Sequence, residues 1–297
     1  MGYNHFKNVS NKALAATIDP MSKTNIKAPN HWLDNHAWKL STLPFLLFIT
    51  VPLLALFVRT NPAGVWSNLR QDPIQQAIRL SLSTSITTVA VTVLLGTPVA
   101  YYLAHRHYRF YRLIDTLIDL PTVLPPAVAG VALLMAFGRR GLVGAWLGPL
   151  GISIPFTQIA VVMAQTFIAA PFYIKSAAVG FFAVDCELKK AAALDGAGRW
   201  QTFRYVIAPI SWMSLLSGCV MTWARALGEF GATIIFAGNF PGRTQTMPLA
   251  IYIGFEIDMN EALTLSVILI VFSFLALILV KGFLHQRMNI LAEEVFE

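Results

Sequence analysis

The sequence predicts an all-α membrane protein whose chain crosses the bilayer six times. Of its 297 residues, 56% are hydrophobic and only 12% are charged, whereas soluble domains carry about 25% charged residues. The apolar residues gather in six segments, each near the ~20 residues that a helix needs to cross a bilayer. The basic residues gather in alternate loops, and this pattern requires an even number of spans.

The six apolar segments each have a distinct character. They fall at 40–58, 77–104, 121–138, 156–184, 206–236 and 261–284. The first has no internal charge from Leu43 to Val58, the second is rich in hydroxyl and β-branched residues, and the third opens with prolines and is the shortest. The fourth carries Lys175 near its end, the fifth carries Arg225 and Glu229, and the sixth is uniformly apolar from Ala262 to Val280.

The basic loops predict the orientation of the chain. Lys and Arg are most frequent before the first span, at 105–112 and at 189–204, and Lys281 and Arg287 follow the last span. These regions share one side of the membrane if there are six spans, and that side is cytoplasmic. We therefore expect both termini in the cytoplasm of a cell-membrane protein, with a polar tail at 1–39, a six-span domain at 40–286 and a second tail at 287–297.

The composition argues against several other classes. A net charge of +7 would suit nucleic acid, but the basic residues lie in loops beside spans, so we expect membrane lipid and no nucleic acid. The chain has only Cys186 and Cys219, and no disulfide framework is expected. We find no G-x-x-x-x-G-K-[ST] loop, no metal-ligand spacing and no Gly-x-Ser-x-Gly elbow, and expect no catalytic residue, metal site or bound cofactor.

A polar stretch separates the fourth and fifth segments, in the predicted cytoplasmic loop 185–209. Asp185 can cap a helix through the strong helix formers Ala191–Ala193. Gly196 and Gly198 can end that helix and turn the chain into a second short one. A small-residue helix of this kind can lie in the groove of a partner. An amphipathic helix resting on the membrane surface fits the same residues.

This stretch resembles the E-A-A signature of permease subunits of binding-protein-dependent ABC importers. The matching residues are Glu187, Ala191, Ala192, Gly196 and Pro209, and Ala208 stands where the family often has Leu. The resemblance implies the type I permease fold, with a coupling helix that enters a cleft of a separate ATPase. It assigns ATPase coupling to Glu187, Ala191, Ala192, Asp195, Gly196 and Ala197. It also implies a homodimer with two ATP-binding subunits, which alone would use ATP and Mg²⁺.

Residues 223–252 resemble the fifth span and following loop of molybdate permeases. The core A-R-A-L-G-E-F-G-A is shared with sulfate permeases, while the continuation G-N-F-P-G-R-T-Q-T-M-P is closer to the molybdate branch. The resemblance covers roughly 75–285. It implies import of molybdate, and of tungstate, delivered by a periplasmic or lipid-anchored extracellular binding protein.

Three alternatives remain open. A sulfate or thiosulfate permease would have the same architecture. A secondary transporter driven by an ion gradient would need ionisable residues in several spans and internal repeats. A membrane-anchored assembly factor would not need the coupling stretch beside a charged span.

Two interpretations compete for Arg225 and Glu229, which are four residues apart and therefore share a helical face. In the first interpretation they form a structural ion pair that fixes helix packing. In the second, Arg225 supplies positive potential to an oxyanion pathway. Hydroxyl groups of the same span are further pathway candidates, on Thr222, Thr233 and Ser217.

Small residues and a turn-rich loop complete the predictions. Gly228 and Gly231 allow close helix packing, or a gate. The external loop 238–248 contains Asn239, Arg243 and Thr244, which are candidates to contact a docked binding protein or to receive the anion. A plain solvated loop fits them as well.

Overall fold

The computed structural model describes residues 31–105 and 110–296, with side chains over 42–105, 110–279 and 281–282. The described residues form helices and contain no strand, which confirms the all-α prediction. Four helices are long and apolar enough to cross a membrane, or up to six if each of two bent helix pairs is one span. The structure therefore agrees with the predicted count of six spans only if each bent helix pair is counted as one span.

The first span belongs to α2, which runs from His31 to Arg59. Most of its side chains from Leu43 to Val58 are exposed, as expected of a helix surrounded by lipid. The helix begins before the predicted span at 40, so residues 31–39 of the predicted tail are helical. Residues 1–30 of that tail lie outside the described residues.

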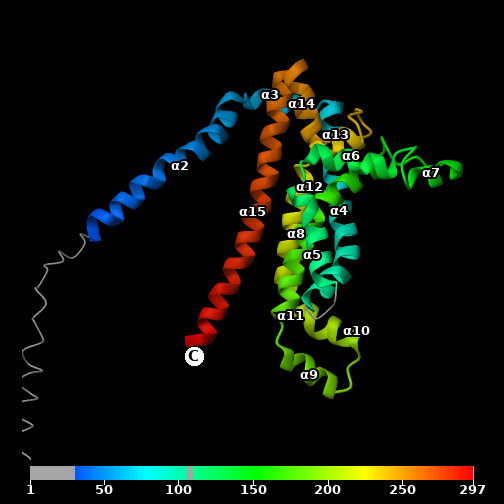
Figure 1. Cartoon of the computed structure of the whole chain (residues 1–297). Helices are drawn as coiled ribbons and strands as arrows, with labels where there is room; N and C mark the ends of the chain where they lie inside the picture. Colours follow the sequence, from blue (N-terminus) through cyan, green and yellow to red (C-terminus); the bar gives the residue numbers. More distant parts are fainter. Residues whose placement is uncertain (1–30, 106–109, 297) are drawn as a thin grey trace, which may run out of the picture. The chain divides into compact units, whose positions relative to one another are not determined.

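Three helices pack together at the centre of the unit that runs from Leu56 onward: α4 (Asp72–Ala104), α8 (Gln158–Phe182) and α12 (Trp212–Leu227) (Figure 1). Glycines bring α8 and α12 close together. A Cβ atom at Gly218 of α12 would lie 3.1 Å from the Cα of Tyr173, and one at Gly180 of α8 would lie 2.5 Å from the Cβ of Ser214. Small residues permit this close approach between membrane helices.

A stripe of buried hydroxyl groups fixes α4 against its neighbours. It consists of Ser81, Thr84, Ser85, Thr88 and Thr92. The Ser81 hydroxyl accepts a hydrogen bond from the Met247 N–H at 2.7 Å, and the Ser85 hydroxyl accepts one from Trp223 Nε1 at 3.0 Å. Thr88 donates to Gln165 of α8 at 3.0 Å. Such bonds contribute only about 0.6 kcal/mol each in a membrane, so their main effect is to set helix register.

The third predicted span, 121–138, is not one straight helix. It comprises the end of α5 (Tyr111–Val123) and all of α6 (Pro126–Phe137), which meet at a bend of 116°. The pair Pro125–Pro126 explains the bend, because a residue before proline avoids the helical conformation, and Leu124 is extended. With 12 residues, α6 alone is only about 18 Å long.

The fifth predicted span, 206–236, is also broken. The chain passes from α10 (Arg199–Thr202) through a π-helical turn, η2 (Phe203–Ile207), and α11 (Ala208–Ile210) before bending by 73° into α12. A short helix, α13 (Gly231–Phe236), follows the end of α12 at Leu227.

Helices α6 and α13 pack closely, and glycines decide how closely. A Cβ atom at Gly231 would lie 2.7 Å from the Cβ of Pro126, and one at Gly130 would lie 2.8 Å from the Ala232 carbonyl oxygen. The prediction of close packing is therefore confirmed for Gly231. It is wrong for Gly228, which caps α12 and whose nearest atom would lie 3.7 Å away.

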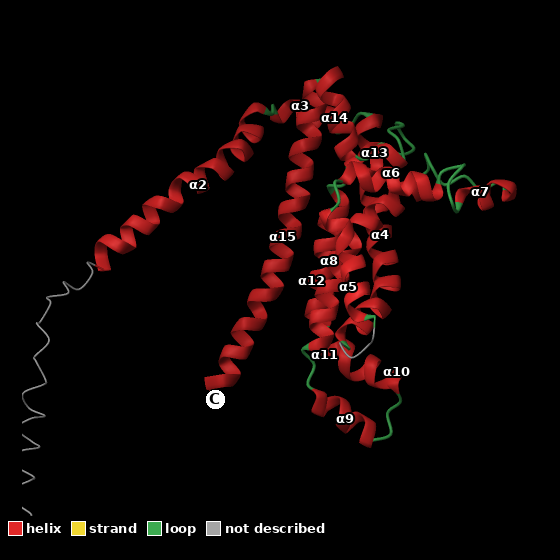
Figure 2. Ribbon diagram, in the orientation of Figure 1, coloured by secondary structure: helices red, strands yellow, loops and turns green. Residues whose placement is uncertain are grey.

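The remaining helices are mostly short (Figure 2). They are α3 (Pro62–Asn68), α7 (Gly144–Leu147) with the 3-10 turn η1 (Gly148–Leu150), α14 (Met247–Ile257) and the long α15 (Met259–Phe296). The sequence did not predict α14, which packs on α15. The predicted tail at 287–297 is instead a helical continuation of α15 through Phe296.

Candidate functional site

A pair of short helices forms the polar stretch between α8 and α12. The first, α9 (Cys186–Leu194), begins at Asp185, whose Oδ1 accepts the Glu187 N–H at 2.9 Å. It ends where the Ala197 N–H reaches the Ala192 carbonyl oxygen at 2.9 Å. Gly196 adopts a left-handed φ of 81°, as glycine does after a helix end. The second helix, α10, follows directly, so the prediction of two short helices joined at a glycine is confirmed.

This helix pair buries none of its own residues. Leu194 at its tip is 89% exposed and Trp200 is 68% exposed. Both apolar side chains are therefore accessible, either to the groove of a partner or to the membrane surface. Glu187 and Lys190 form an ion pair at 2.8 Å on this surface. The hydrogen bond from Lys190 to Glu187 raises the pKa of the lysine above its ordinary value.

The residues predicted to couple to an ATPase all lie on this helix pair and its turn. Four are exposed: Glu187, Ala191, Asp195 and Gly196. Ala192 and Ala197 are half-buried, because the bond between them closes the end of α9. The structure thus brings the six residues into one element, and their role in coupling stays a prediction.

The Arg225–Glu229 pair spans the break between α12 and α13. The prediction of a single helical face is wrong, since α12 ends at Leu227. The two side chains nevertheless meet, with Arg225 Nη1 2.8 Å from Glu229 Oε2. Glu229 is 1% exposed, and its Oε1 accepts the Ala232 N–H at 2.9 Å in the first turn of α13. The carboxylate therefore joins α12 to the amino-terminal end of α13, where a negative charge is stabilising.

The hydroxyl candidates of the fifth span do not gather around Arg225. Thr222 is buried and donates to the Ala169 carbonyl oxygen of α8 at 3.3 Å, so it packs two helices of this subunit together. Thr233 is fully buried, and its hydroxyl has no hydrogen-bond partner among the described residues. Ser217 is half-buried on α12. Among the pathway candidates of this span, only Arg225 is both charged and partly exposed, with a side-chain exposure of 32%.

The candidates in the external loop play unequal parts. Thr244 is buried, and its hydroxyl accepts the Phe240 N–H at 3.1 Å, so it closes the loop. Asn239 is half-buried and donates to the Leu249 carbonyl oxygen at 3.5 Å. Arg243 is exposed. Of the three, Arg243 has the side chain available to another molecule.

A charged cluster escaped the sequence analysis. Lys175 of α8 donates to Asp119 of α5 at 2.8 Å and also to Asp115, one helical turn away. Each of the three side chains is roughly one-third to one-half exposed. The sequence shows a lysine alone in the fourth segment, while both aspartates precede the predicted third segment. Their spacing of four residues was the available signal, because it places both on one face of a helix.

The fold defines a class of protein: a multi-pass helical membrane protein with an exposed pair of short helices between two of its long helices. The comparisons identify the family. Residues 93–289 match the family model described as binding-protein-dependent transport system inner membrane component. The chain belongs to this family. It is therefore a multi-pass protein of the inner membrane, and the transport subunit of its system and not an enzyme.

Individual relatives agree with this assignment. The chain is 40% identical over 226 residues to the molybdenum transport system permease protein of Mycobacterium tuberculosis. This match covers 76% of this chain and 86% of the relative. It is 35% identical over 210 residues to a sulfate transport system permease protein of Synechococcus elongatus, covering 68% and 72% respectively. A bacterial ABC transporter involved in alginate import shares the fold, with a TM-score of 0.66 at 15% identity over 97% of this chain and 99% of that chain.

Proposed function

We propose that this chain is the permease subunit of an ATP-driven ABC importer for molybdate, and for tungstate. The observation that carries the proposal is the exposed pair α9–α10, a capped element that buries none of its own residues. The molybdenum permease relative, matched over most of its length, supports the cargo.

In this proposal two copies of the chain form the pathway, and two ATP-binding subunits each receive one α9–α10 pair. Both termini and the helix pair lie in the cytoplasm. The chain itself binds no cofactor, and ATP and Mg²⁺ act on the partner ATPase. ATP binding draws the two helix pairs together and turns the spans outward, so that two distant sites are coupled.

A periplasmic or lipid-anchored binding protein delivers the oxyanion to the opposite side. Arg243 and Asn239 are the residues proposed to meet it. Arg225 remains the proposed source of positive potential in the pathway, with Glu229 holding it in place.

The second candidate is a sulfate or thiosulfate importer of the same design, and the sulfate permease relative favours it. Uptake by the reconstituted complex, with labelled molybdate in competition with tungstate and sulfate, separates the two. We expect tungstate to compete and sulfate to compete poorly. Uptake that persists without ATP but collapses with the ion gradient would overturn the ABC proposal.

A further inference from the structure

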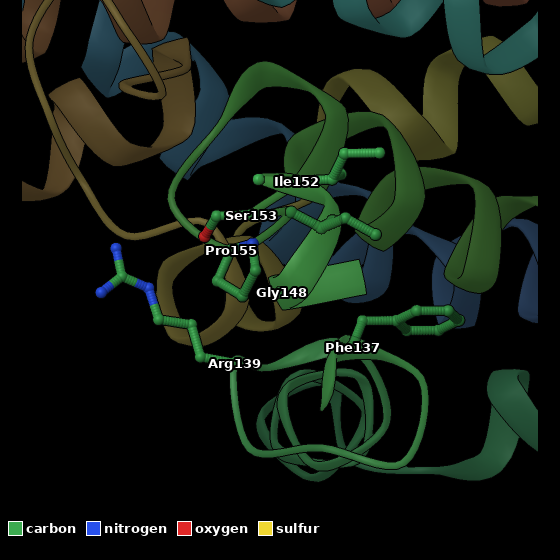
Figure 3. Close-up of a pocket in the computed structure, with 9 residues that line it drawn as sticks. Phe137, Arg139, Gly148, Ile152, Ser153 and Pro155 are labelled. Carbon is green, nitrogen blue, oxygen red and sulfur yellow. The ribbon is translucent and has the colours of Figure 1, made fainter. Parts of the chain in front are cut away.

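A cavity of about 260 Å³ opens beside α7, in the segment between α6 and α8 (Figure 3). It is lined by Phe137, Arg139, Gly144, Gly148, Gly151, Ile152, Ser153, Ile154 and Pro155. Pockets for drug-sized ligands begin near ~300 Å³. The cavity lies just below this range and has room for a small group such as a tetrahedral anion.

The cavity carries an unpaired positive charge. Arg139 lines it and makes no ion pair among the described residues, whereas the neighbouring Arg140 does not line it. The sequence has no acidic residue between Asp119 and Asp185, so nothing nearby in the chain neutralises this guanidinium. A planar guanidinium binds oxyanions through two parallel hydrogen bonds.

A free donor accompanies the charge. Neither the hydroxyl nor the N–H of Ser153 makes a hydrogen bond within the part of the chain that the structure describes. In Figure 3 the Arg139 guanidinium and the Ser153 oxygen lie on the same side of the cavity. A Cβ atom at Gly148 or Gly151 would meet nothing within 4 Å, so no side chain fills the space there.

The wall that carries Ser153 is held in a strained conformation. Phe156 has a φ of 63°, the only left-handed value outside glycine among the described residues. Its N–H points to the Phe236 carbonyl oxygen of α13, at 3.4 Å, and its ring packs edge-on against Phe240 at 6.0 Å. Strained backbone persists where the surroundings enforce it, and it clusters at binding sites.

We propose that this cavity binds a tetrahedral oxyanion group, with Arg139 as the cation and Ser153 as a second donor. None of the residues that line the cavity belongs to the α9–α10 pair or to the fifth span. It lies in the loop between the third and fourth spans, which the basic-loop pattern places outside the cytoplasm. The same segment of the chain exposes the apolar side chains of Leu142, Trp146 and Leu150, by 83%, 82% and 71%.

The same oxyanion chemistry has two sources: free anions in the external medium and the phosphate of a lipid headgroup. The experiment uses the full chain, purified in a phosphate-free detergent. Labelled phosphate and labelled molybdate are tested by equilibrium dialysis, and phosphatidylglycerol by native mass spectrometry against a phosphate-free glycolipid.

The matched variants are Arg139→Gln and Arg140→Gln, which remove the same charge from adjacent exposed residues. We expect Arg139→Gln to weaken binding of at least one probe about tenfold, and Arg140→Gln to change it less than about twofold. Ser153→Ala should weaken it about fivefold. Dialysis binding alone identifies free anions as the source, and a lipid adduct alone identifies the headgroup.

Absence of binding by every probe, or equal losses in the two arginine variants, would overturn the proposal. Size-exclusion profiles check that each variant is folded. The assay measures no uptake, so its failure leaves the importer proposal standing, and a failure of molybdate uptake leaves the oxyanion site standing.

Discussion

The Glu229 carboxylate meets the Arg225 guanidinium at 2.8 Å across the point where α12 ends. Its second oxygen accepts the Ala232 N–H of the next helix at 2.9 Å. One buried side chain thus holds two helix segments and one cation. The pair is therefore more than an isolated ion pair within one helix, and its parts can be separated by substitution.

Removing Arg225 should cost more than removing both charges. Arg225→Ala leaves Glu229 buried and unpaired, and breaking such a pair costs about 3–5 kcal/mol; the partial exposure of Arg225 lowers this value. The double variant Arg225→Ala/Glu229→Gln keeps an acceptor for the Ala232 N–H and should unfold at a higher temperature than Arg225→Ala. Thermal unfolding in detergent measures the order. The reverse order would show that the pair does not hold the break together.

The turn at Gly196 should tolerate no larger residue. Its φ of 81° is left-handed, and a β-branched residue there costs about 1–2 kcal/mol. Gly196→Val should distort the turn between α9 and α10, so that the ATPase fails to co-purify or hydrolyses ATP without uptake. Gly198→Ala is the control, because Gly198 has a φ of −68°. Normal coupled uptake by Gly196→Val would contradict the assigned role.

Leu194 should matter for assembly and not for folding. It is 89% exposed at the end of α9, so Leu194→Asp removes no internal packing. We expect an unchanged melting temperature and loss of the co-purifying ATPase. Leu142→Asp, at a residue 83% exposed in the segment before α7, serves as the control and should retain the ATPase. Equal retention by both variants would indicate that the tip of α9 is not covered by a partner.

Lys175 should behave as the shared partner of two carboxylates. Lys175→Met leaves Asp115 and Asp119 unpaired on one face of α5, whereas either Asp→Asn substitution leaves the lysine with one carboxylate. We expect Lys175→Met to be the most destabilising of the three, by only about 0.5–1 kcal/mol because water can solvate the partly exposed carboxylates. Adding both Asp→Asn substitutions to it should restore part of the loss. Thermal unfolding of the set tests this, and three equal effects would refute a shared cation.

The sequence could predict the helical class and the surface helix pair because these depend on local signals. Apolar length and basic loops indicate spans, and a capping aspartate followed by a glycine indicates the ends of α9. The broken spans were harder to predict. The hydrophobicity of residues 206–236 predicts one continuous segment. In the structure, Gly228 allows the chain to leave α12, and Glu229 stabilises the first turn of α13.

The partners of buried groups could not be predicted either, since they join residues far apart in the chain. Lys175 meets aspartates 56 and 60 residues away. Thr222 looked like a pathway hydroxyl, but its acceptor lies on α8, 53 residues earlier. Such contacts depend on how helices pack, which periodicity alone does not determine.

The π-helical turn η2 has a mechanical consequence. On its outgoing side, the helix pair continues from α10 through η2 and α11 in helical turns, and the chain then bends by 73° into α12. On its incoming side, Asp185 is extended between α8 and α9. The helix pair is thus joined to α12 through helical turns with one bend, and to α8 through an extended residue. Because the Ser211 hydroxyl at that bend donates to the Gly180 carbonyl oxygen of α8 at 2.9 Å, a force on the helix pair would reach α8 as well as α12.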